Sequence, residues 1–395
     1  GDWQKNPTYY GLRGTSSAHL SEHLSEMVET VVGDLEESKC CKITDEGDLS
    51  PLNLGMIASY YYVQYRTIEL IASSVTAKTK IRGVLEILSA SWEFSSLPMR
   101  FGEEKTLKQL LRTLPHQPPE GTSFDSNTKA LILLQCHFSR KTIPSDLRVD
   151  QDLALKEGVT LIQAIVDVVS SNGWLKPALA AMELSQMLIQ GLWNKDHPLK
   201  QIPHFDEDIV NRCLEYKGED SIESVFDILS LEDDVRNSLL QLPDDKMADV
   251  AVFCNNYPNV DVEYKVVDPE DLSCGDVVEV TINLEREIDD DLTEEELGAI
   301  GKVSAPLYPG EKKESWWIVI GDASKNSLLA LKRANFVRHT SVKLEFLAPE
   351  EPGDYNLSLF CMSDSYLGCD QEYSIELSVA AASDSESDDD DNSEG

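Results

Sequence analysis

The sequence has little positive charge and no long apolar run. It carries 71 acidic against 34 basic residues, a formal net charge of −37 over 395 residues. Non-specific binding to nucleic acid requires Lys and Arg to neutralise phosphates, so this composition argues against it and favours basic partner proteins. No apolar stretch reaches the roughly 18 residues of a membrane-spanning helix, and no signal peptide is recognisable. We therefore expect weak or no direct RNA binding and no membrane partner.

The sequence also lacks the common catalytic motifs. Its eight cysteines form no C-x-x-C pair and no zinc-ligand spacing, which is typical of a protein from a reducing compartment. There is no P-loop, no strand followed by G-x-G-x-x-G and no G-x-S-x-G elbow. We therefore expect this chain to contain no catalytic residue, cofactor or metal of its own.

One short motif offers a remote alternative to that expectation. The segment HLSEH, from His19 to His23, fits the H-x-x-E-H pattern of a group of zinc peptidases. On a helix the two histidines face the same way, and Glu22 could act as a base. No third zinc ligand is identifiable downstream, so an ordinary amphipathic helix is the preferred interpretation.

Periodicity predicts an α+β multidomain protein. Apolar spacing is helical in the first part of the chain and changes to a period of two near residue 259. The predicted parts are an α-rich unit (1–53), a helical bundle (54–198), a helix–loop–helix (199–257), a β-sandwich (258–380) and a disordered acidic tail (381–395). A helix is expected from residue 16 or 17 to about 38, and a single long helix over 56–75.

The predicted sandwich is antiparallel and of immunoglobulin or fibronectin-III type. Seven alternating or β-branched runs separated by turn residues occupy about 120 residues. The phrase EPGDY places Tyr355 at the start of one strand, as in the tyrosine corner of such sandwiches. The run EREIDDDLTEEE is expected to be an exposed loop between strands.

The stretch SSNGWLKPALAAMELSQMLIQGLW contains a long apolar helix with a narrow polar stripe. At 100° per residue, Glu183, Gln186 and Gln190 fall within an arc of about 60°, and Trp193 flanks it. A helix that is apolar over most of its circumference is surrounded by other elements, so the stripe must face water, a groove or a partner. It is either a thin solvated strip or the lining of a channel, and its lack of Arg predicts weak RNA contact.

Adjacent tryptophans begin one predicted strand of the sandwich. Because successive side chains of a strand point to opposite faces, one of Trp316 and Trp317 should fill the core and the other should face outward. Exposed tryptophans are frequent hot spots of protein interfaces. We therefore expect the outward tryptophan to contribute to a protein-interaction surface.

Several long segments carry a resemblance to a known family. NLGMIASYYYVQYRTIEL, NGWLKPALAAMELSQMLIQGLW, LKQIPHF, WWIVIGD and FCMSDSYLGCDQEY resemble the Sec63 homology region of large superfamily-two helicases. The similarity covers nearly the whole chain, and is greatest to the C-terminal cassette of the dual-cassette spliceosomal RNA helicases of the U5 particle. NPTYYGL resembles the end of the winged-helix domain that precedes this region.

The resemblance implies a nuclear, non-catalytic part of a helicase that acts in pre-mRNA splicing. Its partners would be spliceosomal proteins and the upstream motor domains, for which it would serve as a regulatory scaffold and docking platform. The helix with the polar stripe resembles the ratchet helix of this family, which implies that Glu183, Gln186, Gln190 and Trp193 face a nucleic-acid path. The helix–loop–helix departs from classical units of that kind because it lacks their G-x-G hairpin.

Two related alternatives remain. The same homology region occurs in a membrane protein of the endoplasmic-reticulum translocon, which would be marked by membrane spans and a J domain. It also occurs in other dual-cassette helicases, of transcription or ribosome rescue. Neither membrane spans nor a J domain occur in this sequence, and the helical segments are more similar to the helicase, which we therefore prefer; another dual-cassette helicase stays possible.

Overall fold

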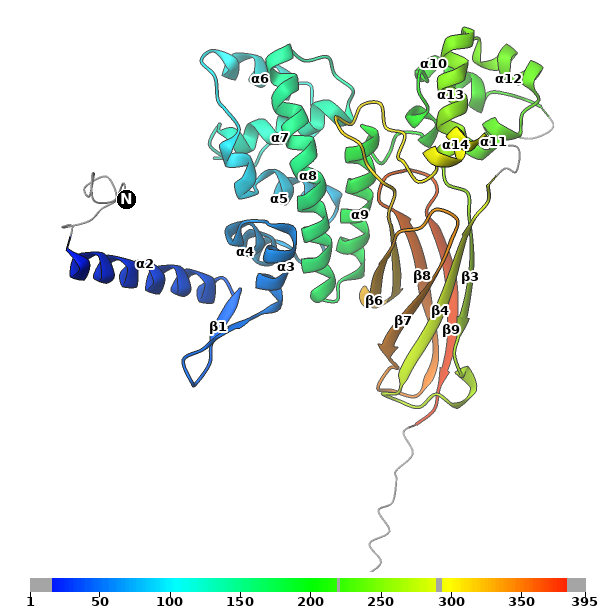
Figure 1. Ribbon diagram of the computed structural model, residues 1–395. Coiled ribbons are helices and arrows are strands. Elements are labelled where there is room, and N and C mark those ends of the chain that lie inside the picture. Colours follow the sequence, from blue (N-terminus) through cyan, green and yellow to red (C-terminus); the bar gives the residue numbers. More distant parts are fainter. Residues whose placement is uncertain (1–15, 219–220, 289–292, 382–395) are drawn as a thin grey trace, which may run out of the picture.

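The structure is a computed structural model that describes residues 16–218, 221–288 and 293–381. Figure 1 shows a helical half lying beside a half built from β-strands, with the helix α2 (Ser17–Glu37) projecting from the helical half. This is the predicted mixture of helices and antiparallel sheet. In the described part of the chain, no helix is both long and apolar enough to cross a membrane.

The first helix, α2, has the predicted bounds but no buried residue. The Ser16 hydroxyl caps it by accepting a hydrogen bond from the His19 backbone N–H. Its apolar face is exposed: Leu24, Met27, Val28 and Val31 keep 41%, 43%, 60% and 50% of their surface. A short hairpin of β1 (Cys41–Ile43) and β2 (Leu49–Pro51) follows.

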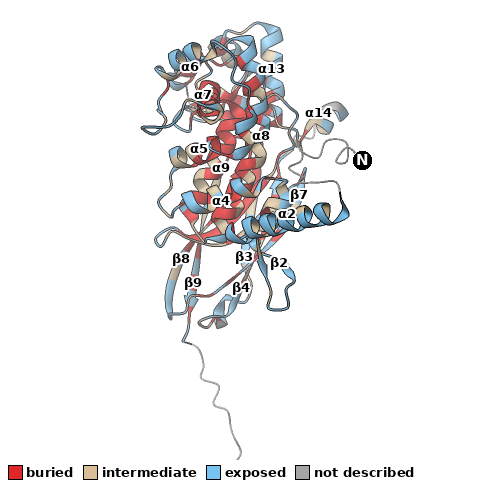
Figure 2. Cartoon of the chain, turned by 90° about the vertical axis from the view of Figure 1, so that its left-hand side faces the viewer, coloured by how far each residue is buried: buried red, intermediate tan, exposed pale blue. Residues whose placement is uncertain are grey.

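The helical half contains seven α-helices between residues 53 and 190. They are α3 (Asn53–Tyr61), α4 (Tyr65–Ser74), α5 (Ile81–Ser89), α6 (Glu103–Leu111), α7 (Ser126–Phe138), α8 (Ser145–Ser171) and α9 (Leu175–Gln190), with the 3-10 turn η2 (Trp92–Ser96). Figure 2 shows the most buried residues along α7, α8 and α9. The prediction of one helix over 56–75 is wrong, because Tyr62 adopts a left-handed conformation (φ 54°) that ends α3.

Short helices connect the bundle to the sheets. They are η3 (Pro198–Gln201), α10 (Glu207–Leu214), α11 (Val225–Ser230), α12 (Asp233–Leu240) and α13 (Asp244–Asn256). A capping box starts α11, in which Ser224 and Asp227 each accept the other's backbone N–H. These helices share one apolar core with the sheets.

All seven predicted strand segments are strands, arranged in two antiparallel sheets. One sheet has the order β3 (Val260–Val266), β4 (Val277–Arg286), β7 (His339–Leu347). The other has the order β6 (Ser327–Ala334), β5 (Trp316–Asp322), β8 (Gly353–Ser363), β9 (Gln371–Val379). The Tyr355 hydroxyl donates to the Glu351 carbonyl oxygen at 2.7 Å, which is the hydrogen bond expected of a tyrosine corner.

The segment between β4 and β5 is not only a loop. After the 3-10 turn η4 (Pro269–Asp271) and strand β4, the helix α14 (Glu294–Ala299) begins at the end of the acidic run that was predicted to be an exposed loop. Residues 289–292 of that run, the acidic tail after 381 and the segment NPTYYGL lie outside the described residues. The prediction of a loop is therefore wrong for the part that α14 covers.

Candidate functional site: the bundle–sheet seam

Three polar side chains of α9 are bonded to the segment 363–370, which joins β8 to β9. The Ser185 hydroxyl donates to the Asp364 carbonyl oxygen at 2.8 Å. The Gln186 Nε2 donates to the Ser363 carbonyl oxygen at 2.8 Å. The Gln190 Nε2 donates to the Ser365 carbonyl oxygen at 2.8 Å. We call this contact between α9 and residues 363–370 the seam.

The seam changes the interpretation of the polar stripe. Gln186 and Gln190 are 3% and 2% exposed, so the expectation that they border an open path is wrong. The sheets cover the side of α9 that the other bundle helices leave uncovered. A side-chain amide can donate a hydrogen bond to a buried carbonyl oxygen instead of to water, so polar residues on a helix need not be exposed. Glu183 is half-buried, and burial raises the pKa of its carboxyl. Whether RNA meets any residue of the stripe stays a prediction.

Asp370 places a half-buried carboxyl in the seam. Both of its carboxyl oxygens accept from the Gln186 Nε2, at 2.9 and 2.8 Å, and the Ser363 N–H donates to one of them at 2.8 Å. Burial raises the pKa of Asp370 to about 7, although these hydrogen bonds oppose the shift. The carboxyl therefore changes its charge near neutral pH inside the seam.

A third glutamine extends the seam toward the short helices. Gln201 donates from Nε2 to the Leu367 carbonyl oxygen at 2.7 Å and accepts from the Leu367 N–H at 3.1 Å. The Tyr257 hydroxyl donates to the same carbonyl oxygen at 2.7 Å. Gly368 has a φ of 83°, and an added Cβ would lie 2.9 Å from Pro198. The segment 363–370 is thus bonded both to α9 and to the helices that follow it.

Trp193 packs inside the bundle and not along the predicted stripe. It is 8% exposed, and its ring meets Phe138 edge-on at 5.1 Å and His116 at 5.4 Å. Its Nε1 donates to the Ser139 hydroxyl at 2.9 Å. The left-handed Gly191 ends α9 and turns the chain inward before this ring.

Both tryptophans of β5 are buried. Trp316 and Trp317 are each 1% exposed, so the expectation of one exposed tryptophan is wrong. Their side chains do point to opposite faces: Trp316 belongs to the core between the sheets, and Trp317 belongs to the core of the helical bundle. The outward face of this sheet is covered by the bundle of the same chain, which no local sequence pattern reports.

The open face beside the seam belongs to α8, which the sequence did not single out. Val149 and Leu153 keep 59% and 53% of their surface, and Lys156 one turn further is exposed. Closer to the end of α8, Arg333 of β6 pairs with Asp167 at 2.8 Å. The signal was present in the sequence as Val149 and Leu153, two apolar residues one helical turn apart among polar residues of α8.

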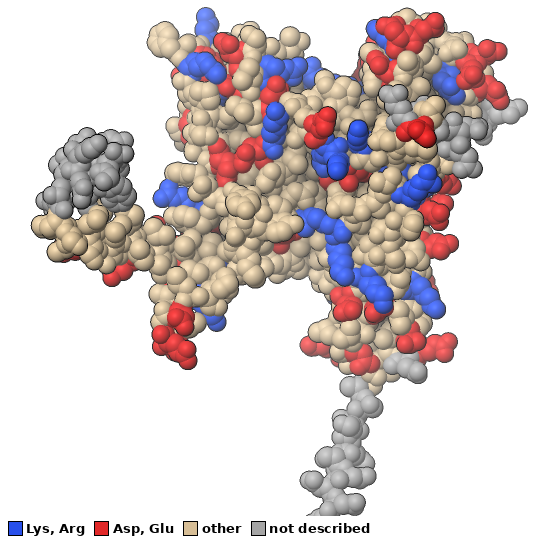
Figure 3. Space-filling model, in the orientation of Figure 1, with Lys and Arg blue, Asp and Glu red and all other residues tan. Residues whose placement is uncertain are grey.

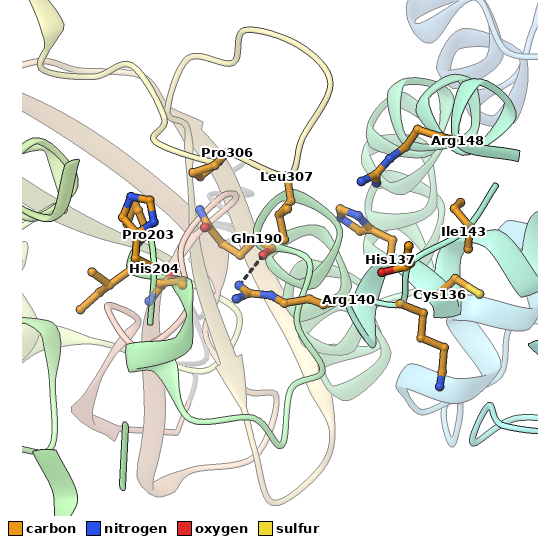
Figure 4. A pocket seen from close by; sticks show the side chains of 14 residues that line it. Cys136, His137, Arg140, Ile143, Arg148, Gln190, Pro203, His204, Pro306 and Leu307 are labelled. Atoms are coloured by element: carbon orange, nitrogen blue, oxygen red, sulfur yellow. Dashed lines mark hydrogen bonds between the residues drawn. The ribbon is translucent and has the colours of Figure 1, made fainter. Parts of the chain in front are cut away.

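A pocket of about 350 Å³ lies at the junction of the bundle, η3 and the loop before β5. Figure 4 shows Arg140 and Gln190 between two walls, one with His137 and Arg148 and the other with His204. The Arg140 guanidinium donates to the carbonyl oxygens of Gln190 and Gly191, at 3.3 and 3.0 Å, and so caps the end of α9. Burial lowers the pKa of His137 to about 4, which keeps this ring neutral.

The histidine motif does not assemble a metal site in the described part of the chain. His19 is exposed on α2, and its Nδ1 lies 2.7 Å from the Ser16 hydroxyl. His23 is half-buried on the same helix. No group of three or more metal-ligating side chains is found among residues 16–218, 221–288 and 293–381. The geometry gives no support to the zinc-peptidase alternative.

Comparison with known proteins identifies the family. The family described as "Sec63 Brl domain" matches residues 51–376, and one described as "Winged Helix-turn-helix domain" matches residues 3–45. The "U5 small nuclear ribonucleoprotein 200 kDa helicase" of Homo sapiens is 49% identical over 378 residues, which are 96% of this chain and 17% of that protein.

Two further relatives are of similar kind. The "DExH-box ATP-dependent RNA helicase DExH12" of Arabidopsis thaliana is 48% identical over 377 residues, 95% of this chain and 17% of that protein. The "Activating signal cointegrator 1 complex subunit 3-like" protein of Dictyostelium discoideum is 46% identical over 374 residues, 94% of this chain and 16% of that protein. The chain thus spans about a sixth of the relatives that it matches. It belongs to the Sec63 Brl domain family.

Proposed function

We propose that this chain is the C-terminal Sec63-type module of a spliceosomal ATP-dependent RNA helicase, and that it acts there as a regulatory scaffold and protein-interaction platform. The observation that carries the proposal is the identity of 49% across 96% of the chain with U5 helicases. ATP hydrolysis and the unwinding of U4/U6 in pre-mRNA splicing would belong to the rest of the parent protein. The site of action would be the nucleus.

The hydrogen bonds of the seam favour a scaffold function and argue against a channel that binds RNA tightly. The amides of Gln186 and Gln190 donate hydrogen bonds to carbonyl oxygens of the same chain, so they are not free to bind a nucleic-acid backbone. The contact also joins the helical bundle to the sheets through buried hydrogen bonds. Such a unit can present several surfaces in fixed relative positions, which is what a docking platform needs.

The two sheets are proposed to form a sandwich of the immunoglobulin or fibronectin-III kind. Strand order supports this, since the first, second and fifth strands of the unit form one sheet and the other four form the second. The hydrogen bond of Tyr355 adds support at the corner that leads into β8.

The apolar face of α2 is proposed to pack against the rest of a winged-helix unit and the motor domains of the parent. The four exposed apolar residues of α2 fall on one side of the helix, and the winged-helix match includes this helix. Exposed apolar faces of this kind usually mark an interaction site. The motor domains would therefore be partners within the same parent protein.

Any RNA in the parent would more readily meet α8 than α9, because α8 carries the exposed face beside the seam. That face offers Lys156 but also Asp152 and Glu157, so the proposed contact is weak. A gel-shift titration of the chain with a labelled 12-nucleotide oligouridylate should give a Kd above about 10 µM at physiological salt. Binding below about 100 nM would contradict the scaffold proposal.

A direct test of the parent's identity is immunoprecipitation of the tagged endogenous protein, followed by detection of co-purified RNA. Enrichment of U4, U5 and U6 small nuclear RNA is expected. The second candidate, favoured by the 46% identity to an activating signal cointegrator subunit, is a helicase of that other class. Co-purification of a cointegrator complex without U5 RNA would establish that candidate and refute the spliceosomal one. Purified chain should show no ATPase above background in either case.

A further inference from the structure

Three connected hollows run over the α6 end of the helical bundle. The first follows α6 and is lined by Lys105, Lys108 and Arg112, among others. The second lies between α6 and the end of α7, and the third is the junction pocket described above. Gln109 lines the first and the second hollow, and Lys141 lines the second and the third. We call this continuous surface the basic groove.

The charge of the groove is the reverse of the charge of the chain. Glu104 is the sole carboxylate among the described residues that line the three hollows, and it is paired with Lys108. Six cationic side chains line them besides Arg100, which is bound to Asp150: Lys105, Lys108, Arg112, Arg140, Lys141 and Arg148. The whole sequence has 71 carboxylates for 34 cations, so this surface is locally positive on an acidic protein. Figure 3 shows Lys and Arg side chains over this end of the bundle and its junction with the sheets, with some Asp and Glu side chains between them.

Most of these cations have room for a ligand. Within the described residues, Lys105, Arg112 and Lys141 make no ion pair, and the first two are exposed. Arg148 is exposed and donates to the Gln151 amide oxygen at 2.8 Å, which leaves its charge uncompensated. Asp196 lies near Arg140, and the exposed Asp249 is bonded to His204, but neither carboxylate lines the junction pocket.

Apolar surface lies at both ends of the groove. Phe101 is fully exposed at the start of α6, and Met99 beside it keeps 39% of its surface. The turn that presents Phe101 is fixed, because Arg100 binds Asp150 and Gly102 adopts a φ of 82°. At the other end, the junction pocket is lined by apolar side chains: Ile143, Ile202, Pro203, Pro306 and Leu307.

We propose that the basic groove binds an extended acidic segment of a partner protein, with a bulky apolar side chain of that segment in the junction pocket. Charge complementarity selects an anionic partner, and the pocket has the size of a large side chain. A nucleic-acid strand fits less well, because the groove offers Phe101 but no row of rings on which successive bases stack. The chain's net charge also repels a long polyanion more strongly than a short peptide. The proposal holds whatever the parent protein is, since it rests on this chain alone.

The test is fluorescence polarisation with the whole chain and three labelled probes. The first is a 12-residue peptide of Asp and Glu with two Leu and one Phe. The second is the same peptide with Asn and Gln in place of the acids, and the third is a 12-nucleotide oligouridylate. The acidic peptide should bind at least tenfold more tightly than either other probe, and its affinity should fall as salt rises.

Two variants locate the binding at the groove. Lys105→Glu/Arg112→Glu reverses two charges on α6, and Lys141→Glu reverses one beside the junction pocket. Each should weaken binding of the acidic peptide at least fivefold. The matched control is Lys78→Glu/Lys80→Glu, which makes the same change in net charge at two exposed lysines outside the groove and should stay within twofold of the wild type. Circular dichroism of each variant should match the wild type, since all the changed side chains are exposed or half-buried.

The outcomes that overturn the proposal are distinct. Equal weakening by the control variant would mean that only net charge matters, and loss from one groove variant alone would mean that the groove is not continuous. Tighter binding of the oligouridylate would replace the peptide by RNA as occupant. A concentration-dependent dimer that disappears when residues 382–395 are removed would make the acidic end of a second copy the ligand.

Discussion

The side-chain amide of Gln186 donates to both carboxyl oxygens of Asp370, at 2.9 and 2.8 Å, across the boundary between α9 and the β8–β9 connection. The same nitrogen lies 2.8 Å from the Ser363 carbonyl oxygen, so one amide serves three acceptors. Gln186, which we expected beside a nucleic-acid path, thus links two parts of the fold by hydrogen bonds.

Gln186→Ala should destabilise the protein by about 1–3 kcal/mol, because it removes the donor from the buried Ser363 carbonyl and from the half-buried Asp370 carboxyl. The measurement is the free energy of unfolding in urea at pH 7. Gln109→Ala is the control, since Gln109 is exposed on α6 and its loss should change stability by less than about 0.5 kcal/mol. Equal effects of the two changes would mean that the seam contributes little to stability.

Asp370 should make stability depend on pH. Its pKa is about 7 in the folded protein and near 4 in the unfolded chain, so the folded state holds the proton more tightly. The contribution to stability is therefore full below about pH 4, falls as the pH rises to about 7, and is constant above that. Between pH 5 and 8, Asp370→Asn should gain stability relative to the wild type as the pH rises, by up to about 1.4 kcal/mol per unit below pH 7. A difference that is independent of pH would show that Asp370 keeps an ordinary pKa.

The strands and the long helices were predictable from local pattern, because their side chains repeat with the period of the element that buries them. The run SVKLEFLA of β7 has this property, because its buried and more exposed residues alternate. Local pattern could not predict which part of the chain packs against each apolar or polar face. The stripe with Gln186 and the outward face of Trp317 were both assigned to partners outside the chain, whereas each is covered by the other half of the same chain.

Single breaks in the backbone were also beyond local pattern. Tyr62 ends α3 in a left-handed conformation inside a segment that has helical apolar spacing on both sides. The basic groove went unnoticed because its cations come from α6, the end of α7 and the start of α8, and no stretch of sequence shows them together. A strongly negative total charge concealed a locally positive surface.

The two tryptophans of β5 should respond differently to replacement by phenylalanine. The Trp316 Nε1 donates to the Glu314 carboxylate at 2.7 Å, and Glu314 also pairs with the buried Arg286. The Trp317 Nε1 is buried and has no partner in the described part of the chain. Trp316→Phe should therefore cost at least about 1 kcal/mol more than Trp317→Phe, because it removes a charge-assisted hydrogen bond. Urea unfolding of both variants measures this, and equal losses would mean that packing volume alone decides the cost.

Gly321 should tolerate no side chain, because β5 bulges there and α9 begins against it. A Cβ at this position would lie 2.7 Å from the Ser327 carbonyl oxygen and 2.9 Å from both terminal methyl carbons of Leu175. Since the backbone oxygen cannot move away cheaply, Gly321→Ala should destabilise the protein by about 1–3 kcal/mol. Gly33→Ala is the matched control: Gly33 lies in α2 with no atom within 4 Å of the added carbon, and the change should stabilise the helix by up to about 1 kcal/mol. The midpoint of thermal unfolding should fall for the first variant alone. An unchanged midpoint for Gly321→Ala would show that the start of α9 can shift away from the sheet without loss.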